Sequence, residues 1–103
     1  MSNKIRVSEK SIEMMLVREI KKMGGLCLKL YSPWFRGMPD RMIILKGLPV
    51  RFVELKAPDT RHGLSEAQKK VHEQLRSYGV DVDLVWSKKT VKEYIEKLQN
   101  ELI

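Results

Sequence analysis

The chain has 103 residues, a length that predicts one domain spanning 1–103 and leaves too little sequence for a second hydrophobic core. Hydrophobic residues at 43% and charged residues at 32% exclude wholesale disorder. The charge balance is less ordinary: 20 Lys and Arg against 13 Asp and Glu give a net charge of +7. That excess favours a polyanionic partner such as nucleic acid, although many basic proteins bind nothing acidic, so charge alone leaves both interpretations open.

No apolar run approaches the roughly 18 residues that a membrane-spanning helix needs, and the polar first ten residues lack the apolar core of a secretion signal. The single cysteine, Cys27, lies in an apolar run. It excludes an internal disulfide and predicts a buried thiol in a reducing compartment. We therefore expect an intracellular protein with no membrane partner.

In the first half of the chain, apolar residues recur at helical spacing from Ser8 to Met23, with Ser8 as the N-cap and Gly24-Gly25 as the stop. Three short apolar runs follow this helix, separated by a Pro- and Gly-bearing loop at 32–39 and a tight turn at 46–49. They predict three strands, at 26–31, 41–45 and 50–56.

A loop at 57–63 precedes a second helix, whose apolar face runs from Leu64 to Tyr78 and which Ser65 and Gln68 open as a capping box. Residues 80–86 alternate apolar and acidic positions, which predicts a strand with one wetter face. A last helix is expected to begin at a Thr90–Glu93 capping box. The order α-β-β-β-α-β-α predicts an α/β fold with a central mixed sheet flanked by helices.

The acids of the second and third strands form the most informative pattern. Alternation along 50–56 places Glu54 and Lys56 on one face of the third strand. A hairpin between these strands would bring Asp40, which precedes the second, beside both of them. Two carboxylates and the Leu55 backbone carbonyl would offer the hard oxygen ligands that Mg²⁺ prefers. Taken singly, these residues are also consistent with an exposed ion pair and a turn residue.

The first helix offers a further acid. At 100° per residue Glu9 falls on the apolar stripe beside Leu16 and Ile20, and Glu13 falls at the edge of that stripe. A carboxylate facing a core is costly unless it is paired or bound to a metal. An acid in the first helical turn also offsets the helix dipole, so a structural role for Glu9 remains open.

Taken together, the element order and four short segments resemble the virus-type replication-repair nuclease (VRR-NUC) family of the PD-(D/E)xK nuclease superfamily. The segments are GGLCLK at 24–29, SP at 32–33, GMPDR at 37–41 and FVELKAP at 52–58. Stand-alone phage proteins belong to this family. The resemblance covers 9–86 and implies a restriction-endonuclease-like fold. For a phage-encoded member it also implies the cytoplasm of a bacterial host.

The resemblance implies that Asp40 and Glu54 bind metal, that Lys56 is the catalytic lysine, and that a helix-one glutamate completes the site. In archaeal Holliday-junction resolvases of the superfamily, a glutamate is followed by an aliphatic residue three positions on and a leucine seven on. Glu9 matches that spacing and is the first choice, with Glu13 in reserve. Gln68 matches a glutamine that the family tends to carry, besides its capping role.

The histidines His62 and His72 have no Cys or His at metal-ligand spacing, so we expect them to be surface residues. Trp34 and Phe35 precede Asp40 and would either stack on unpaired bases or pack against the first helix. If the fold is correct, five cations form a basic rim that would contact DNA phosphates: Lys29, Arg36, Arg41, Arg61 and Lys69.

The expected activity is hydrolysis of phosphodiester bonds in DNA with Mg²⁺ or Mn²⁺, by direct attack of a metal-activated water. The resemblance implies branched DNA, and a four-way junction for a stand-alone member. Cutting a junction on two strands requires two active sites, which predicts a homodimer. Two alternatives remain open: a non-catalytic basic DNA-binding module on the same fold, and a sequence-specific restriction-type endonuclease.

Overall fold

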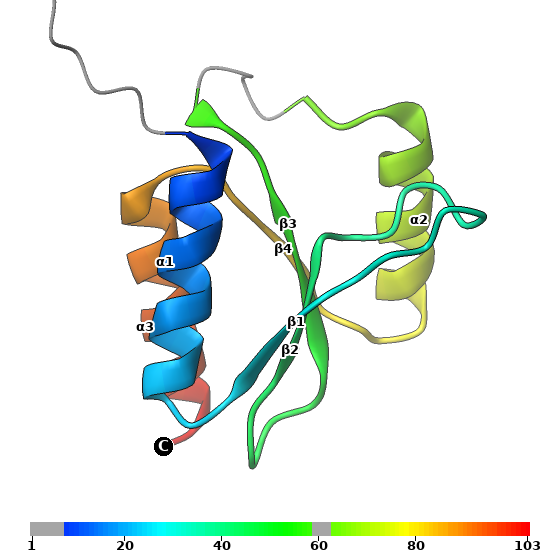
Figure 1. Ribbon diagram of the computed structural model, residues 1–103. Helices are drawn as coiled ribbons and strands as arrows, with labels where there is room; N and C mark the ends of the chain where they lie inside the picture. Colours follow the sequence, from blue (N-terminus) through cyan, green and yellow to red (C-terminus); the bar gives the residue numbers. More distant parts are fainter. Residues whose placement is uncertain (1–7, 59–62) are drawn as a thin grey trace, which may run out of the picture.

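The computed structural model describes residues 8–58 and 63–103. A four-stranded sheet separates two helical layers, with two helices on one face and one on the other (Figure 1). The order matches the α-β-β-β-α-β-α prediction. No helix in the described ranges is long and apolar enough to cross a membrane. The elements are α1 (Glu9–Lys22), β1 (Leu26–Lys29), β2 (Arg41–Ile44), β3 (Arg51–Leu55), α2 (Glu66–Ser77), β4 (Val82–Val85) and α3 (Lys88–Glu101).

The strands lie in the order β1-β2-β3-β4, so β1 and β4 are the edges of the sheet. Neighbours β1–β2 and β2–β3 pair antiparallel, and β3–β4 pair parallel across the α2 crossover. The mixed sheet confirms the predicted fold class. In the β2–β3 hairpin Arg41 is paired with Val53, and the next step of that register sets Asp40 opposite Glu54.

The main core lies between the sheet and the α1/α3 layer. From α1, the residues Ile12, Leu16 and Ile20 are fully buried there, and Val53 and Leu55 of β3 meet them. All five β3 residues are buried, because α2 covers the opposite face of the same strand. A polar side chain on either face of β3 is therefore removed from water and has to find its partners within the protein.

Two expected boundaries and one expected apolar-face residue are corrected by the structure. Strand β1 ends at Lys29, so Tyr31 belongs to the following loop, and Tyr78 is exposed at the end of α2. The last helix begins one turn earlier than predicted, because Ser87 is its N-cap and Thr90 is the reciprocal partner. The Thr90 hydroxyl accepts the Ser87 backbone N–H at 2.9 Å, as the third helical residue of a capping box does. Thr90 is therefore inside the helix, and Ser87 is the N-cap.

Strand β4 is also covered more fully than the predicted wetter face implies. Val82 is buried on the side that α2 covers, and Arg76 of α2 donates to its carbonyl at 2.8 Å. Val85 belongs to the main core on the other side. Asp83 lies on the same side of the sheet as Val85 and forms an ion pair with Lys97 of α3 at 2.8 Å. Asp83, the one acid within β4, thus faces α3.

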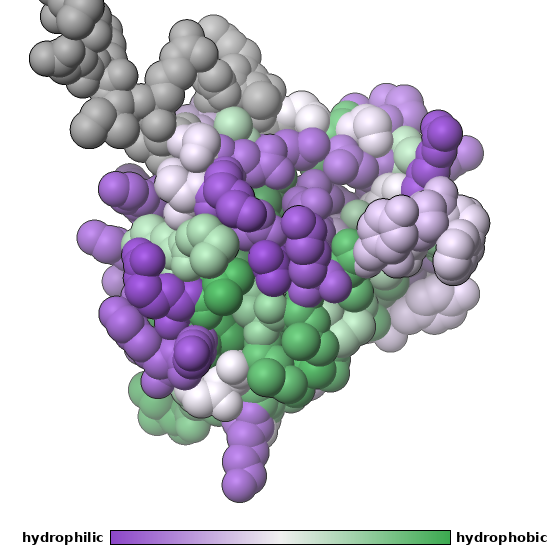
Figure 2. Space-filling view, in the orientation of Figure 1, coloured by the Kyte–Doolittle hydropathy of each residue, from purple (hydrophilic) through white to green (hydrophobic). Residues whose placement is uncertain are grey.

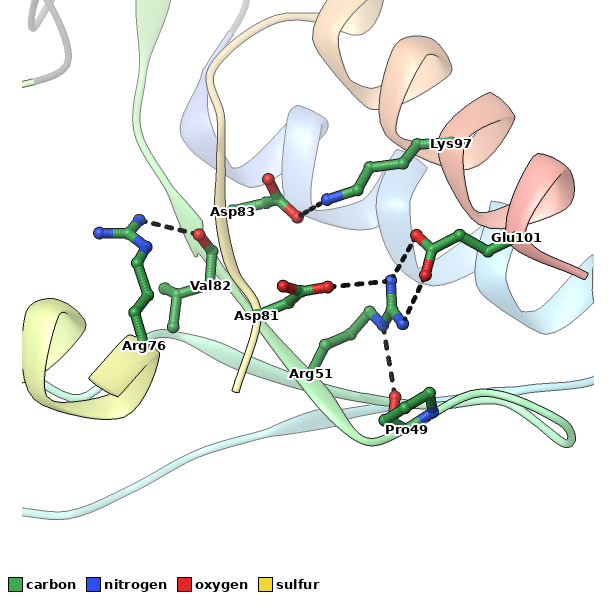
Figure 3. Close-up of polar contacts among 8 residues, drawn as sticks. All are labelled: Pro49, Arg51, Arg76, Asp81, Val82, Asp83, Lys97 and Glu101. Atoms are coloured by element: carbon green, nitrogen blue, oxygen red, sulfur yellow. Dashed lines mark hydrogen bonds and ion pairs between the residues drawn. The ribbon is translucent and has the colours of Figure 1, made fainter. Parts of the chain in front are cut away.

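One buried cation anchors α3 to the sheet. Arg51 is the first residue of β3 and only 2% exposed. Its guanidinium donates two hydrogen bonds to Glu101 at 2.8 and 3.0 Å, and it also lies 3.6 Å from Asp81 (Figure 3). The Pro49 carbonyl accepts a further bond at 3.3 Å. This bidentate pairing offsets the cost of burying the charge and fixes the C-terminal turn of α3.

Candidate active site

The carboxyl end of β3 gathers the predicted acids. Glu54 is 2% exposed and points away from the main core, toward the α2 layer, as does Lys56 by strand alternation. Asp40 Oδ2 accepts the Leu55 backbone N–H at 2.7 Å, which fixes the Asp40 carboxylate at the end of β3. The predicted meeting of these residues across the hairpin is therefore confirmed, although their roles stay predictions.

Gln68, in the first turn of α2, links the helix cap to the site. Its side-chain oxygen accepts the Ser65 backbone N–H at 2.9 Å and the Lys56 ammonium at 3.2 Å. Its side-chain nitrogen donates to Glu54 Oε2 at 3.2 Å. Gln68 is therefore the capping residue that the sequence predicts, and the same side chain contacts Glu54 and Lys56, while its role in catalysis stays a prediction. The cap sets the position of the amide, and the amide sets the spacing of Glu54 and Lys56.

The structure corrects the expectation for one histidine. His72 is only 2% exposed, and its Nε2 lies 3.3 Å from Glu54 Oε1. His62 lies outside the described residues. One sequence feature does indicate a position near the site for His72. It follows Gln68 by four residues, so both side chains lie on one face of α2. Without knowing which face of the sheet α2 covers, that spacing does not identify a partner.

Glu54 and His72 lie opposite each other at the buried end of the site. Among the described residues, three buried side-chain polar atoms lack a hydrogen-bond partner: Glu54 Oε1, His72 Nε2 and the hydroxyl of Tyr94. The first two face each other. Burial, followed by the positive charge of Arg76, lowers the pKa of His72. We therefore regard the 3.3 Å contact as a meeting of two neutral groups rather than an ion pair.

Electrostatics at the end of β3 disfavour a charged Glu54 in the protein alone. Burial raises the pKa of Glu54 to about 9, and the hydrogen bond and negative charge of Asp40 act in the same direction. The Lys56 ammonium opposes this shift without cancelling it. Two carboxyl groups in a buried site cannot both ionise without a compensating cation. Added positive charge would therefore favour ionisation of the carboxyl groups in this site.

The two helix-one glutamates have different surroundings. Glu13 accepts Arg41 Nε at 2.9 Å and Cys27's carbonyl binds the same guanidinium, so Glu13 is held in a half-buried ion pair. Glu9 lies one turn earlier, at the exposed start of α1. Partial desolvation and then the charge of Asp40 raise the pKa of Glu9, and Lys56 lowers it. Glu9 therefore lies near enough to Asp40 and Lys56 for their charges to act on it, and its role in the site stays a prediction.

The donor set fits a hard divalent cation. Within residues 8–58 and 63–103 no three His, Cys, Asp or Glu side chains lie close enough to enclose a metal ion. Mg²⁺ does not require such a cage, because it is usually held by one or two carboxylates and keeps several waters. Asp40 and Glu54 supply two carboxylates, and Glu54 Oε1 is a buried oxygen without a hydrogen-bond donor.

The expected DNA-binding residues divide into three groups. Lys29, Trp34, Arg36 and Lys69 are exposed, and Lys69 lies 3.4 Å from Glu66 on the same helix. Arg41 is not free to contact a phosphate, since it holds Glu13 and the Cys27 carbonyl. Arg61 lies outside the described residues. Trp34 and Phe35 do not pack on α1, because their loop lies against α2 (Figure 1).

Known proteins place this arrangement in context. No protein-family model matches the chain. The chain is 48% identical over 52 residues to "Putative nuclease p44" of Acyrthosiphon pisum secondary endosymbiont phage 1, a match that covers 50% of this chain. The match spans only 56% of that phage protein, a little over half its length.

A solved structure described as a VRR_NUC domain gives the broader match. It superimposes with a TM-score of 0.74 at 30% sequence identity, covering 87% of this chain and 97% of the solved one. The similarity covers nearly all of the solved domain and most of this chain. This chain belongs to the VRR-NUC family.

Proposed function

We propose that this protein is a divalent-metal-dependent endonuclease that hydrolyses phosphodiester bonds in branched DNA, with four-way junctions as the preferred substrate. The observation that carries the proposal is the state of Glu54: a buried carboxyl beside Asp40, with one oxygen unpartnered, at the strand end where Lys56 and Gln68 converge. A purely structural acid would be expected to have its buried oxygens satisfied.

In this proposal Asp40, Glu54 and the Leu55 backbone carbonyl would hold Mg²⁺ or Mn²⁺. When bound, the ion supplies a Lewis acid for the phosphate and lowers the pKa of a coordinated water. Asp40 serves as a fixed ligand because the Leu55 N–H orients its carboxylate. Glu9 would complete the set from the exposed start of α1. We prefer it to Glu13 because Glu13 already pairs with Arg41.

Lys56 supplies the positive charge next to the reacting phosphate. Its ammonium is held by the Gln68 amide oxygen at 3.2 Å, so it is positioned before substrate arrives. A preorganised cation stabilises the negative charge that develops on phosphate oxygens in the transition state. Gln68 acts by positioning, since one amide fixes both the Glu54 carboxyl and the Lys56 ammonium.

Substrate choice by DNA shape follows from size and charge. All the described elements belong to the sheet and its two helical layers, and none of them forms a separate module for contacting base edges in a DNA groove. Acidic side chains line a surface hollow beside α3, among them Glu93, Glu96 and Glu101. That face would repel DNA, whereas Lys29 and Arg36 lie exposed on the β1 and loop side.

A homodimer is part of the proposal, because a junction must be cut on two strands. The support is the edge strand β1, whose Leu26 and Leu28 are exposed. Figure 2 shows apolar surface gathered over the lower part of the β1–β2 region. An apolar edge of this kind offers a surface that a second copy would cover.

The test is cleavage of a labelled four-way junction with Mn²⁺ by wild type, Glu54→Ala and Lys56→Ala. Matched controls are Glu96→Ala and Lys46→Ala, which remove exposed charges on α3 and in the β2–β3 turn. We expect cleavage by the wild type and both controls and none by the two site variants. Equal cleavage by all five proteins would refute the site assignment.

The same assay separates the alternatives when flap, single-stranded and linear duplex DNA are added. Salt-dependent binding without metal-dependent cleavage of any substrate would favour a non-catalytic DNA-binding module. Cleavage of linear duplexes only where one short sequence is present would favour a restriction-type enzyme. Size-exclusion chromatography with light scattering of wild type and Leu28→Lys tests the dimer.

A further inference from the structure

A groove of about 350 Å³ lies between the β1–β2 loop and α2. The loop contributes Trp34, Phe35 and Arg36, and α2 contributes Lys70, Val71 and Gln74. The volume falls in the range of sites that hold a small organic group. Two cations, one amide and two aromatic rings border it, and none of the described residues that line it is acidic.

The aromatic side chains of the loop are unusually open to solvent. Trp34 is 88% exposed and Phe35 is 48% exposed. Rings of this size are normally buried or used at interfaces, where their flat faces provide contact area at little conformational cost. Neighbouring Arg36 is also exposed. A ring next to a guanidinium is the combination that binds a stacked base and its phosphate.

The loop is held at a defined distance from α2. Gly37 has φ +97° and packs so tightly that a Cβ there would collide with the Ala67 backbone carbonyl and meet Val71 Cγ2 at 2.9 Å. The Leu30 N–H donates to the Asp40 carbonyl at 2.9 Å and closes the base of the loop. The groove is therefore a fixed feature of the fold, and only glycine permits so close an approach.

The groove adjoins the candidate active site. Val71, which lines it, directly precedes His72, whose side chain faces Glu54. Ala67, which Gly37 contacts, directly precedes Gln68, whose amide bonds Glu54 and Lys56. One face of α2 thus borders the carboxylates while the adjacent face forms a wall of the groove.

We propose that this groove receives an unpaired nucleobase of the DNA substrate, next to the scissile phosphate. The base stacks on the rings of Trp34 and Phe35, Arg36 and Lys70 neutralise the flanking phosphates, and the Gln74 amide is available to the base edge. The inference rests on the proposed nuclease function and narrows it to substrates with an unpaired base near the cut, as at flaps, gaps and open junction centres.

The test measures binding in EDTA, so that it does not depend on cleavage. Fluorescence anisotropy with a labelled oligo-dT strand and a labelled blunt duplex compares wild type, Trp34→Ala, Trp34→Phe and Tyr78→Ala. Tyr78 is the matched control, an aromatic residue that is 76% exposed at the far end of α2. We expect Trp34→Ala to weaken oligo-dT binding about tenfold and leave duplex binding unchanged. Trp34→Phe and Tyr78→Ala should bind like wild type.

An equal loss on oligo-dT and duplex would overturn the proposal, since it would assign Trp34 to backbone contact alone. Unchanged oligo-dT binding by Trp34→Ala would overturn it as well. Circular dichroism checks the fold of each variant, and because Trp34 is 88% exposed its truncation leaves no cavity in the core. If Glu54→Ala still cleaves, the nuclease site is wrong, and the anisotropy result still decides the groove.

Discussion

The two ends of β3 each bury an ionisable side chain, but the two side chains have different partners. Arg51 at the start and Glu54 near the end are both 2% exposed. Arg51 is met by a bidentate carboxylate, a second carboxylate and a carbonyl. Glu54 is met by another acid, an amide and a neutral histidine, and one of its oxygens has no hydrogen-bond donor. The same strand therefore carries a buried cation that is fully paired and a buried acid whose surroundings favour its neutral form.

This difference suggests that the Arg51 end of β3 serves stability and that the Glu54 end serves function. A buried charge with its partners in place holds elements together, as Arg51 holds α3, and needs nothing from outside. A buried acid whose pKa is raised by its surroundings gains stabilisation only when a cation arrives. Changes at the two ends of β3 should accordingly affect different measurements.

The largest expected effect is on catalysis. Glu54→Gln should lower the cleavage rate about a thousandfold, because the amide keeps the shape but cannot bind a cation as a carboxylate does. The metal-free variant should be at least as stable as wild type at pH 8, since the buried amide has no charge to desolvate. Cleavage rates and urea denaturation check this. If the variant loses both activity and stability, Glu54 stabilises the fold and the proposed role in cation binding is wrong.

The second effect is a dependence of metal-free stability on pH. The pKa of Glu54 is about 9 in the folded protein against an ordinary 4.5, so folding takes up a proton between these values. The free energy of unfolding should therefore fall as pH rises, by at most about 1.4 kcal/mol per pH unit. Denaturation in EDTA at pH 6, 7 and 8 measures the slope. Glu54→Gln should remove this fall, and a fall of the same size that survives in the variant would contradict the assignment. The lowered pKa of His72 acts in the opposite direction, toward higher stability as the pH rises from 6 to 7.

A third prediction concerns His72. His72→Leu should weaken Mn²⁺ binding about tenfold, because the side chain next to Glu54 Oε1 helps to orient that carboxyl. His72→Gln has a similar volume and keeps a polar group near the Nε2 position, so it should bind Mn²⁺ almost as well as wild type. Calorimetric titration measures both. An equal loss of Mn²⁺ affinity in the two variants would show that the polar group of His72 does not matter and that the residue contributes only packing.

The smallest effect is expected at the other end of the strand. Glu101→Gln should lower the free energy of unfolding by about 1–2 kcal/mol, because Arg51 loses its ionised partner while Glu101 itself is partly exposed. Cleavage per folded molecule should not change. Arg51 lowers the pKa of Glu101, so this stabilisation is present above pH 4.5 and is lost as the pH falls below it.

The control for this prediction is Glu96→Gln, which neutralises an exposed acid on the same helix. It should leave the free energy of unfolding unchanged within a few tenths of a kcal/mol. If Glu101→Gln abolished cleavage without altering stability, the division between the two ends of β3 would fail.

Sequence patterns predicted what depends on neighbours along the chain. Helical spacing and the Ser8 cap located α1, alternation placed Glu54 and Lys56 on one face of β3, and the short turn predicted the hairpin that brings Asp40 beside them. The start of α3 was misplaced by one turn, because Ser87 and Thr90 both suit a cap and only the observed hydrogen bonds distinguish them.

What the sequence by itself determined about this protein is thus the order of its elements and the grouping of Asp40, Glu54 and Lys56, since both follow from local periodicity and one hairpin. Only the tertiary structure shows that Arg41 reaches across from β2 to pair with Glu13, which is why we propose Glu9 as the helix-one acid of the site. The same holds for His72, which is buried against Glu54 because α2 crosses that face of the sheet. Contacts between distant segments set these partners, and no spacing along the chain encodes them.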